Sequence, residues 1–336
     1  MNLPSKMVVA LARHSGPSHV LQIETVPRPD PGAGQVLVRV ESASVNYADV
    51  KRRRGDAYPF PTTFPFVPGS EVVGEVVALG AGVPGPAPGS RVLALVGGDG
   101  QGGYAQFALA FAPQVMPLPD GLLPEQAIGL LVAGTTAMLL IRRVARLQAG
   151  ESVLIPAAHG AVGGYAVQLA RLAGASRIIT LGSRLPPPLA DHHVDSSQPG
   201  WADAVLAATE GRGVDVLLEA SGGPQLAEGL RALAPFGRAV VYGAASGQDA
   251  ALDAATVRRW LYAPAPNQAI TAFNLGGWFM HRPDAAGQAV GEMIGLLASG
   301  QVTAPVVQHF PLAQAALAHH RLESRQTTGK LVLKPW

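Results

Sequence analysis

Cysteine is absent from the 336-residue chain. Without thiols the protein forms no disulfide, has no thiolate nucleophile and offers no cysteine ligand to zinc. Charged residues make up only 14% of the sequence and the formal net charge is +2, so we expect no broad basic face for nucleic acid. The densest cationic run, Lys51–Arg54, lacks interleaved aromatic residues, and we interpret it as a solvated helix end.

Long hydrophobic runs are also missing. The longest uncharged apolar stretch, 126–141, is too short to span a membrane, and the first residues have no signal-peptide pattern. We therefore expect a cytoplasmic protein without membrane association. Glycine and proline, by contrast, are abundant, with 40 and 29 residues, and 48% of the chain is hydrophobic. This composition indicates a turn-rich globular protein, and the length favours two domains.

The segment 152–174 carries the strongest local signal. It reads as a β-strand, a tight turn of small residues and an amphipathic helix, and the turn contains Ala158-x-Gly160-x-x-Gly163. Small residues let the backbone approach a pyrophosphate, and the helix N-terminus offers free N–H groups and a positive dipole end. The pattern favours a dinucleotide site; the alternative is a glycine-rich turn that binds nothing.

The end of the next strand selects the cofactor. NAD-binding folds place an acidic residue about 20 residues beyond the glycines, where it holds the ribose 2′-hydroxyl. Here the strand 177–181 is followed by Gly182-Ser183-Arg184, which contains no acid. A hydroxyl and a guanidinium suit a 2′-phosphate, so the sequence predicts NADPH; the alternative is that Arg184 is an ordinary solvated loop residue.

Hydrophobic periodicity divides the chain into a β-rich part and an alternating part. Period-two segments between glycine and proline loops dominate the beginning, with one short helix at 46–53. From Pro124 onward strands alternate with helices, which is typical of a parallel sheet with helices on both faces. The tail returns to strand, helix and strand. We therefore predict an α/β fold with domains at 1–123, 124–300 and 301–336, the last rejoining the first.

Further motifs occur along the whole chain, and they are Asn46-x-x-Asp49, Pro65-Phe66-Val67-Pro68-Gly69-Ser70-Glu71, Pro117-Leu118-Pro119-Asp120-Gly121, Gly211-x-Gly213-x-Asp215 and Thr327-Thr328-Gly329-Lys330-Leu331. With these motifs the chain resembles the medium-chain dehydrogenase/reductase superfamily, in its zinc-free quinone oxidoreductase type. The resemblance implies a GroES-like, β-rich catalytic domain and a Rossmann domain with a doubly wound parallel sheet. Zinc-dependent relatives have Cys and His where this chain has Asn46 and Ser70, so we expect no metal site.

Direct hydride transfer from NADPH to a quinone or an α,β-unsaturated carbonyl is then the expected chemistry. Such an acceptor needs alignment and hydrogen-bond donors for its developing oxyanion. Asn46 is the candidate donor; the alternative is that it only caps the helix that follows. Tyr47 and Tyr58 are candidates for lining the acceptor pocket or donating a proton, with simple packing as the alternative. Asp49 is expected to serve the domain's own hydrogen bonding.

The resemblance also implies cofactor contacts. Asn46 and Thr135 are expected near the nicotinamide, and Ser183 and Arg184 at the 2′-phosphate. The other contacts are Gly160, Ala161, Val162 and Gly163 at the pyrophosphate, Gly243, Ala244 and Ala245 after a strand, Phe273, Asn274 and Leu275 through backbone groups, and Lys330 near the phosphates. The expected partners are a small-molecule acceptor and a second copy of the chain in a homodimer.

One stretch departs from the family pattern. The prolines of 186–188 cannot lie inside a helix, so the helix that relatives have there is expected to be a short loop. The resemblance implies that Ser196 or Ser197 replaces the usual tyrosine contact to the 2′-phosphate. His192 and His193 fall in this region and are interpreted as unpaired surface residues, and His159 as a solvent-facing residue of the glycine turn.

Two alternative functions stay open at this point. The first is an enoyl-thioester reductase of fatty-acid or polyketide assembly, in which Arg52–Arg54 would form a basic rim for a carrier. The second is a binding protein that keeps the cofactor fold without turnover.

Overall fold

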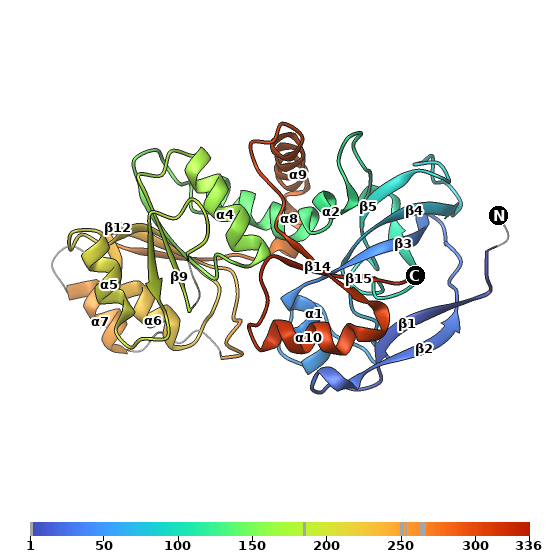
Figure 1. Ribbon diagram of the computed structural model, residues 1–336, viewed down its shortest axis with the longest axis horizontal. Helices are drawn as coiled ribbons and strands as arrows, with labels where there is room; N and C mark the ends of the chain where they lie inside the picture. Colours follow the sequence, from blue (N-terminus) through green and yellow to red (C-terminus); the bar gives the residue numbers. More distant parts are fainter. Residues whose placement is uncertain (1–2, 184–185, 249–251, 253, 263–266) are drawn as a thin grey trace. The chain divides into compact units, whose positions relative to one another are not determined.

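The computed structural model describes residues 3–183, 186–248, 252, 254–262 and 267–336. It contains two compact units, which we describe separately: unit 1 comprises Met1–Val132 and Leu297–Trp336, and unit 2 comprises Ala133–Leu296 (Figure 1). The boundaries between these units fall at different residues from the domain boundaries given by periodicity. The assignment of catalytic and cofactor-binding roles to the units stays a prediction.

Unit 1 is built on a seven-stranded mixed sheet in the order β14-β15-β3-β4-β5-β7, with β6 also paired to β3. Its strands are β3 (Gln35–Val45), β4 (Glu71–Leu79), β5 (Arg91–Leu95), β6 (Phe107–Phe111), β7 (Val115–Pro117), β14 (Val307–Pro311) and β15 (Lys330–Lys334). A separate antiparallel pair is formed by β1 (Lys6–Ala12) and β2 (Leu21–Pro27). Valines that alternate along β3 and β4 fill the core beneath the sheet.

The C-terminal strand completes this sheet beside the end of β3. In the antiparallel pairing of β15 with β3, Leu331 lies opposite Val45. The next element after β3 is helix α1 (Tyr47–Arg54), and helix α10 (Ala315–Glu323) precedes β15. The C-terminal strand β15 is therefore a neighbour of the junction between β3 and α1.

Unit 2 contains a six-stranded sheet in the order β10-β9-β8-β11-β12-β13, in which every neighbouring pair is parallel. The strands are β8 (Ser152–Pro156), β9 (Arg177–Gly182), β10 (His192–Asp195), β11 (Val214–Glu219), β12 (Leu233–Val241) and β13 (Ala269–Ala272). The order runs outward from β8 in one direction and from β11 in the other, which is the arrangement of doubly wound dinucleotide-binding sheets. The predicted doubly wound parallel sheet is confirmed.

Helices cover both faces of this sheet, as Figure 1 shows. Helix α4 (Ala161–Leu172) lies on one face, and α5 (Trp201–Ala208) and α6 (Pro224–Arg231) lie on the other. Side chains of α5 and α6 pack against apolar residues of the strands, including Leu154, Ile179 and Leu217. The remaining helices are α3 (Thr135–Leu139), α7 (Ala254–Tyr262), α8 (Leu275–His281) and α9 (Pro283–Ala298).

Two local expectations need correction. The four-residue strand β10 forms at His192–Asp195, where the sequence was interpreted as a loop. The helical pattern after Pro124 is not one regular helix, because α2 (Pro124–Ala127) is short and π-helical turns flank α3. Among the described residues the segment Pro124–Val144 is long and apolar enough to cross a membrane, but 78% of it is buried inside the fold, which is typical of a core helix.

Candidate functional site

Asn46 lies between β3 and α1 and is only 8% exposed. Its main-chain N–H donates to Asp49 Oδ2 at 2.8 Å. Its side-chain Nδ2 donates to the hydroxyl oxygens of Ser44 at 3.1 Å and Ser70 at 3.3 Å, and its Oδ1 accepts from Lys330 Nζ at 2.5 Å. These side-chain contacts lie outside helix α1, which favours a functional role for the amide over a purely capping one.

Lys330 is the partner that orients the Asn46 amide. Its ammonium donates to the Val45 carbonyl at 3.0 Å as well as to Asn46, and the residue is 4% exposed. Burial lowers the pKa of Lys330, while the charges of Glu71 and Asp49 act in the opposite direction. From the sequence we expected Lys330 near cofactor phosphates. The structure instead places its ammonium against Asn46, so its contacts indicate a role in positioning that amide.

Glu71 begins strand β4 and is fully buried. Its Oε1 accepts from the Leu131 N–H at 2.7 Å, and burial raises its pKa against the opposing effect of the Lys330 charge. Zinc sites in proteins use cysteine, histidine and carboxylate ligands. The side chains that interact with Glu71 are the Ser44 hydroxyl and the Lys330 ammonium, and among the described residues no group of three or more His, Cys, Asp or Glu gathers. These residues do not fit a zinc ion.

Within unit 1, a series of buried hydrogen-bonded side chains begins at Asn46. Asp49 Oδ1 accepts from the Gly69 N–H at 3.0 Å, and its Oδ2 accepts from the Tyr104 hydroxyl at 3.3 Å. The Tyr104 oxygen lies 2.9 Å from His319 Nε2. Burial raises the pKa of Asp49 to about 6 and lowers that of His319 to about 3, so His319 is neutral at pH 7.

Asp49 thereby ties the start of α1 to the backbone that carries Ser70. The sequence interpretation of Asp49 as a hydrogen-bonding residue agrees with these contacts. It missed Tyr104 and His319, because no motif links residues that are 215 positions apart. The glycine at position 69 is the sequence signal that relates to Tyr104. A Cβ on Gly69 would lie 2.6 Å from the Tyr104 ring, so the ring packs there because residue 69 has no side chain.

Tyr47 and Tyr58, the two tyrosines proposed for the acceptor pocket, are half-buried. The Arg52 guanidinium lies 5.4 Å from the Tyr58 ring centroid, and that of Arg54 lies 5.9 Å from the Tyr47 ring centroid. Burial raises the pKa of Tyr58, which makes loss of its proton less favourable. These contacts hold both rings near α1, and their roles toward an acceptor stay predictions.

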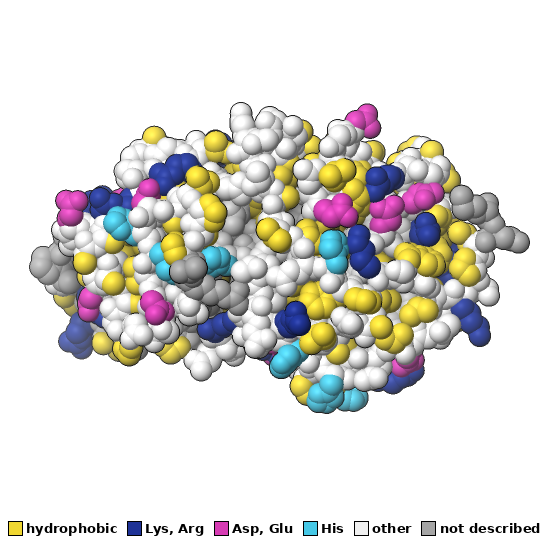
Figure 2. Space-filling view, viewed as in Figure 1, with side chains coloured by type: hydrophobic (Ala, Val, Ile, Leu, Met, Phe, Trp, Pro, Cys, Tyr) yellow, Lys and Arg dark blue, Asp and Glu magenta, His cyan; other side chains and the backbone are white. Residues whose placement is uncertain are grey.

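The arginine run of α1 was interpreted as a solvated helix end, and for Arg52 and Arg53 this interpretation was wrong. Arg52 and Arg53 are 1% and 0% exposed. Arg52 donates to the Asp99 carbonyl at 2.8 Å, Arg53 pairs with Glu323 at 2.5 Å, and Arg54 pairs with Asp56. On the face drawn in Figure 2, positive and negative side chains are interspersed. The guanidinium groups brace loops of unit 1, since buried cations need close partners.

The glycine turn of unit 2 connects β8 to α4. Ala157 has φ 51°, and Gly160 precedes the first residue of α4 and donates its N–H to the Ala157 carbonyl at 2.9 Å. A Cβ on Gly163 would lie 2.5 Å from that same carbonyl oxygen, so helix and strand approach closely only because this residue is glycine. The compact turn and the free N-terminus of a 12-residue helix fit a pyrophosphate.

Other predicted cofactor residues follow the strands of unit 2. Ser183 comes directly after β9 and is exposed, whereas Arg184 lies outside the described residues. Residues 243–245 follow β12, where the Ala245 N–H donates to the Ala220 carbonyl at 3.0 Å. Residues 273–275 follow β13, and Asn274 caps α8. These segments share the carboxyl edge of one parallel sheet with the glycine turn, which is where such sheets bind ligands. Thr135 begins α3 and is fully buried.

Comparison with known proteins agrees with this two-unit organisation. Residues 32–120 match the alcohol dehydrogenase GroES-like domain, and residues 190–333 match the zinc-binding dehydrogenase family. The chain is 32% identical over 334 residues to a quinone oxidoreductase of Pseudomonas aeruginosa, covering 97% of this chain and 99% of that protein. A mycobacterial protein solved in complex with NADPH superposes with a TM-score of 0.86 at 31% identity, covering 98% of this chain and all of that one.

A second kind of relative is much longer. A mycocerosic acid synthase-like polyketide synthase of Mycolicibacterium smegmatis is 32% identical over 328 residues, which are 96% of this chain but 15% of the synthase. Together, these matches and the fold define an oxidoreductase with a GroES-like domain and a nucleotide-binding Rossmann domain. The chain belongs to the medium-chain dehydrogenase/reductase superfamily and is quinone oxidoreductase-like.

Proposed function

We propose that this protein is an NADPH-dependent, zinc-independent reductase that transfers hydride to a quinone or an α,β-unsaturated carbonyl. The observation that carries the proposal is the buried pair of Asn46 and Lys330 beside the half-buried Ser70, which supplies hydrogen-bonding groups where the described residues offer a zinc ion no suitable ligands. Lys330 holds the amide oxygen of Asn46. The Ser70 hydroxyl, whose oxygen accepts from Asn46, keeps its own proton to donate to an acceptor carbonyl oxygen. Asn46 Nδ2 donates to that oxygen when the acceptor replaces Ser44 or Ser70 as its partner, and both donors then stabilise the developing negative charge.

Bound NADPH supplies the hydride. The first turn of α4, Gly160–Gly163, holds the pyrophosphate through main-chain N–H groups. Asn46 and Thr135 are the proposed nicotinamide contacts, residues 243–245 and 273–275 the proposed backbone contacts, and Ser183 with Arg184 the proposed 2′-phosphate contacts. The choice of NADPH is supported by the NADPH complex of a relative and by the missing acid after β9.

A second candidate function is an enoyl-thioester reductase acting within polyketide assembly. The specific observation that favours it is the match to polyketide synthases, which is as strong in identity as the match to the quinone oxidoreductase. Both functions use the same hydride geometry, and they differ in whether the acceptor is free or attached to a carrier. Arg52 and Arg53 of α1 are paired with Asp99 and Glu323, so they do not form the basic rim that an enoyl-thioester reductase was expected to present to a carrier.

We also propose a homodimer. Among the described residues, strand β13 is the last strand of its sheet and pairs only with β12. Nearby in the chain, Leu261 and Tyr262 of α7 are 68% and 78% exposed, and Met280 of α8 is 58% exposed. An unpaired sheet edge beside exposed apolar side chains favours association. Light scattering after size-exclusion chromatography is expected to give twice the 34.6 kDa chain mass, and a monomer would refute this point.

The test of the reductase proposal is NADPH oxidation, followed at 340 nm, with quinones, enones and enoyl-thioesters as acceptors. Quinone or enone turnover supports the leading function, and turnover of enoyl-thioesters alone supports the second. Asn46→Ala is expected to lower kcat by about 100-fold, the scale of one oxyanion donor, while NADPH affinity stays within about threefold. Binding of NADPH without oxidation by any acceptor would refute both functions and favour a binding protein.

A further inference from the structure

The connection between β9 and β10 leaves part of the sheet in unit 2 without a covering helix. The strands β9 and β10 are parallel and joined by 183–191, of which the described residues form no helix. Parallel strands are normally joined by a dozen or more residues, and such crossovers are right-handed. Because β8, β9 and β10 follow one another across the sheet, this crossover belongs on the same face as α4. The described residues of this connection therefore place no helix beside α4 over β9 and β10.

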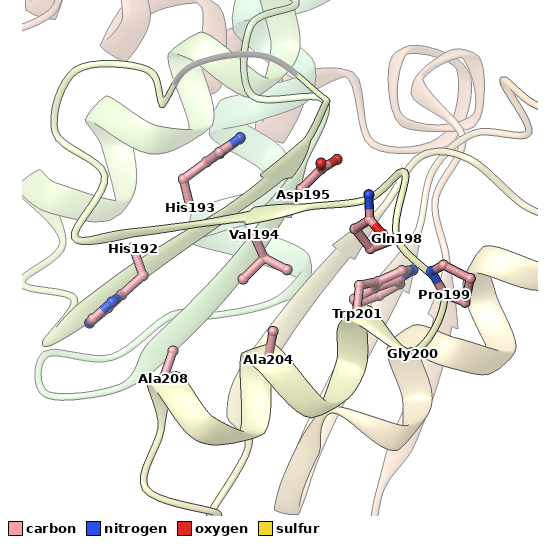
Figure 3. A pocket seen from close by; sticks show the side chains of 10 residues that line it. All are labelled: His192, His193, Val194, Asp195, Gln198, Pro199, Gly200, Trp201, Ala204 and Ala208. Atoms are coloured by element: carbon pink, nitrogen blue, oxygen red, sulfur yellow. The ribbon is translucent and has the colours of Figure 1, made fainter.

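A histidine of β10 lies on this face of the sheet. Side chains alternate along a strand, and Val194 of β10 packs with Trp201 and Val205 of α5 on the opposite face. Figure 3 shows His192 and Val194 on one side of β10, along a hollow of about 410 Å³, and His193 with Asp195 on the other side. His193 therefore points to the side of α4, where a crossover helix normally packs.

One nitrogen of His193 lacks a partner. Its Nδ1 lies 2.8 Å from the Thr180 hydroxyl oxygen on β9. Its Nε2 is buried and has no hydrogen-bond partner among the residues that the structure describes. A buried polar atom left unpaired is costly, which indicates that its partner lies outside the described residues. The earlier interpretation of His193 as an unpaired surface residue was wrong, since Thr180 fixes its ring.

A second imidazole converges on the same place. His159 belongs to the glycine turn and directly precedes Gly160, and its ring centroid lies 6.5 Å from that of His193. The His193 ring also reaches the end of β9, because its Cε1 would lie 3.7 Å from a Cβ on Gly182. Figure 2 shows histidine side chains at the surface of unit 2. Two imidazoles from separate segments thus meet where β8 and β9 end.

We propose that His159 and His193 form the binding site for the phosphate on the adenosine ribose of NADPH. The proposal rests on the proposed function and adds two residues to the cofactor contacts that the sequence predicts. The adenosine half of a dinucleotide lies over the first half of such a sheet, with its 2′-position at the end of the second strand. Imidazole N–H groups bind phosphate oxygens there.

The nearby charges are compatible with this site. Asp195 is the acidic residue on the same side of β10, and it interacts electrostatically with His193. Its carboxylate accepts the Ser197 N–H at 2.9 Å, which holds it toward the following turn. His193 itself is held through Nδ1 by Thr180 on β9, and its buried Nε2 has no hydrogen-bond partner among the described residues.

The test compares two ligands that differ only in the 2′-phosphate, adenosine 2′,5′-bisphosphate and adenosine 5′-monophosphate, by isothermal titration calorimetry. His193→Asn keeps a polar atom near Thr180 but removes Nε2, and His159→Asn removes the second imidazole. Each variant is expected to weaken binding of the bisphosphate by about tenfold, the scale of one hydrogen bond to a charged group, with monophosphate binding unchanged. His192→Asn on the opposite side of β10 is the matched control and is expected to bind both ligands like the wild type.

Equal losses for both ligands, or no loss in the double variant, would overturn the proposal. Thermal unfolding of each variant identifies one that fails to fold, and His159→Asn, which lies in a turn, then decides the question. Because neither ligand carries an acceptor, binding is measured without turnover. Selective loss of bisphosphate binding in a protein that reduces no acceptor refutes only the reductase function, whereas active variants with unchanged selectivity refute only this site.

Discussion

Replacing Asp49 by asparagine tests whether the buried chain behind Asn46 acts as described. Burial raises the pKa of Asp49 from 3.8 to about 6. A carboxyl group with a higher pKa in the folded state binds its proton more tightly there, so its contribution to stability is present at low pH and is lost as the pH rises through about 6. The difference between the two pKa values corresponds to about 3 kcal/mol, of which about half is lost above pH 5.

The substitution also removes an acceptor. Asp49 accepts the N–H groups of Asn46 and Gly69 on different oxygens, and asparagine has only one acceptor oxygen. One buried N–H is left unpaired, which costs about 1–3 kcal/mol at every pH. At pH 5 the variant is therefore expected to be less stable than the wild type. At pH 8 the wild type bears the additional cost of a buried charge. The difference in free energy of unfolding between the wild type and the variant is therefore about 1 kcal/mol smaller at pH 8 than at pH 5.

Urea unfolding of the wild type and Asp49→Asn at pH 5 and pH 8 measures this change. Asp120→Asn, at an exposed position, is the matched control and is expected to show the same difference from the wild type at both pH values. A gap for Asp49→Asn that stays constant or widens toward pH 8 would refute the reasoning. Turnover is expected to fall as well, because Asn46 and the backbone before Ser70 lose their common anchor.

The remaining predictions concern the charge pair and the glycine turn. Lys330→Met leaves the buried Glu71 carboxylate without its opposite charge and is expected to lower the free energy of unfolding by about 3 kcal/mol. Adding Glu71→Gln to the same chain is expected to restore part of this loss. Urea unfolding in which the double variant is no more stable than Lys330→Met contradicts the prediction. Gly163→Ala places a Cβ 2.5 Å from the Ala157 carbonyl oxygen and is expected to lower both Tm and NADPH affinity. Gly164→Ala, whose nearest contact is 3.6 Å, is expected to change neither, and equal NADPH affinity in the two variants would show that close approach at Gly163 is not required.

Elements with strong local patterns were predictable from the sequence. The segment 152–174 was interpreted as a strand, a tight turn and a helix, and it forms β8, the glycine turn and α4. Strand β10 was missed because His192–Asp195 contains a single apolar residue, and its pairing with β9 is decided by the sheet. Short polar edge strands have no periodic signal of their own.

The exposure of Arg52 and Arg53 was predicted wrongly because their partners are distant in the sequence. Three adjacent arginines on a short helix normally face solvent, because buried cations are costly unless paired. Here the partners of Arg52 and Arg53 come from distant segments, the carbonyl of Asp99 and the carboxylate of Glu323. Those partners are 47 and 270 residues away along the chain, and composition alone does not reveal them.

The glycine turn and the Asn46 group also differ in whether the sequence reveals them. The glycine turn is defined by consecutive residues, so a motif finds it. The Asn46 amide is oriented by a lysine 284 residues away, and the sheet pairing of β15 with β3 brings them together. In this buried group Lys330 carries a positive charge between the acids Glu71 and Asp49. The raised pKa of Asp49 means that its ionisation, which makes the group more negative, is the unfavourable step. Negative charge that develops on an acceptor oxygen beside Asn46 is therefore opposed least when Asp49 is protonated.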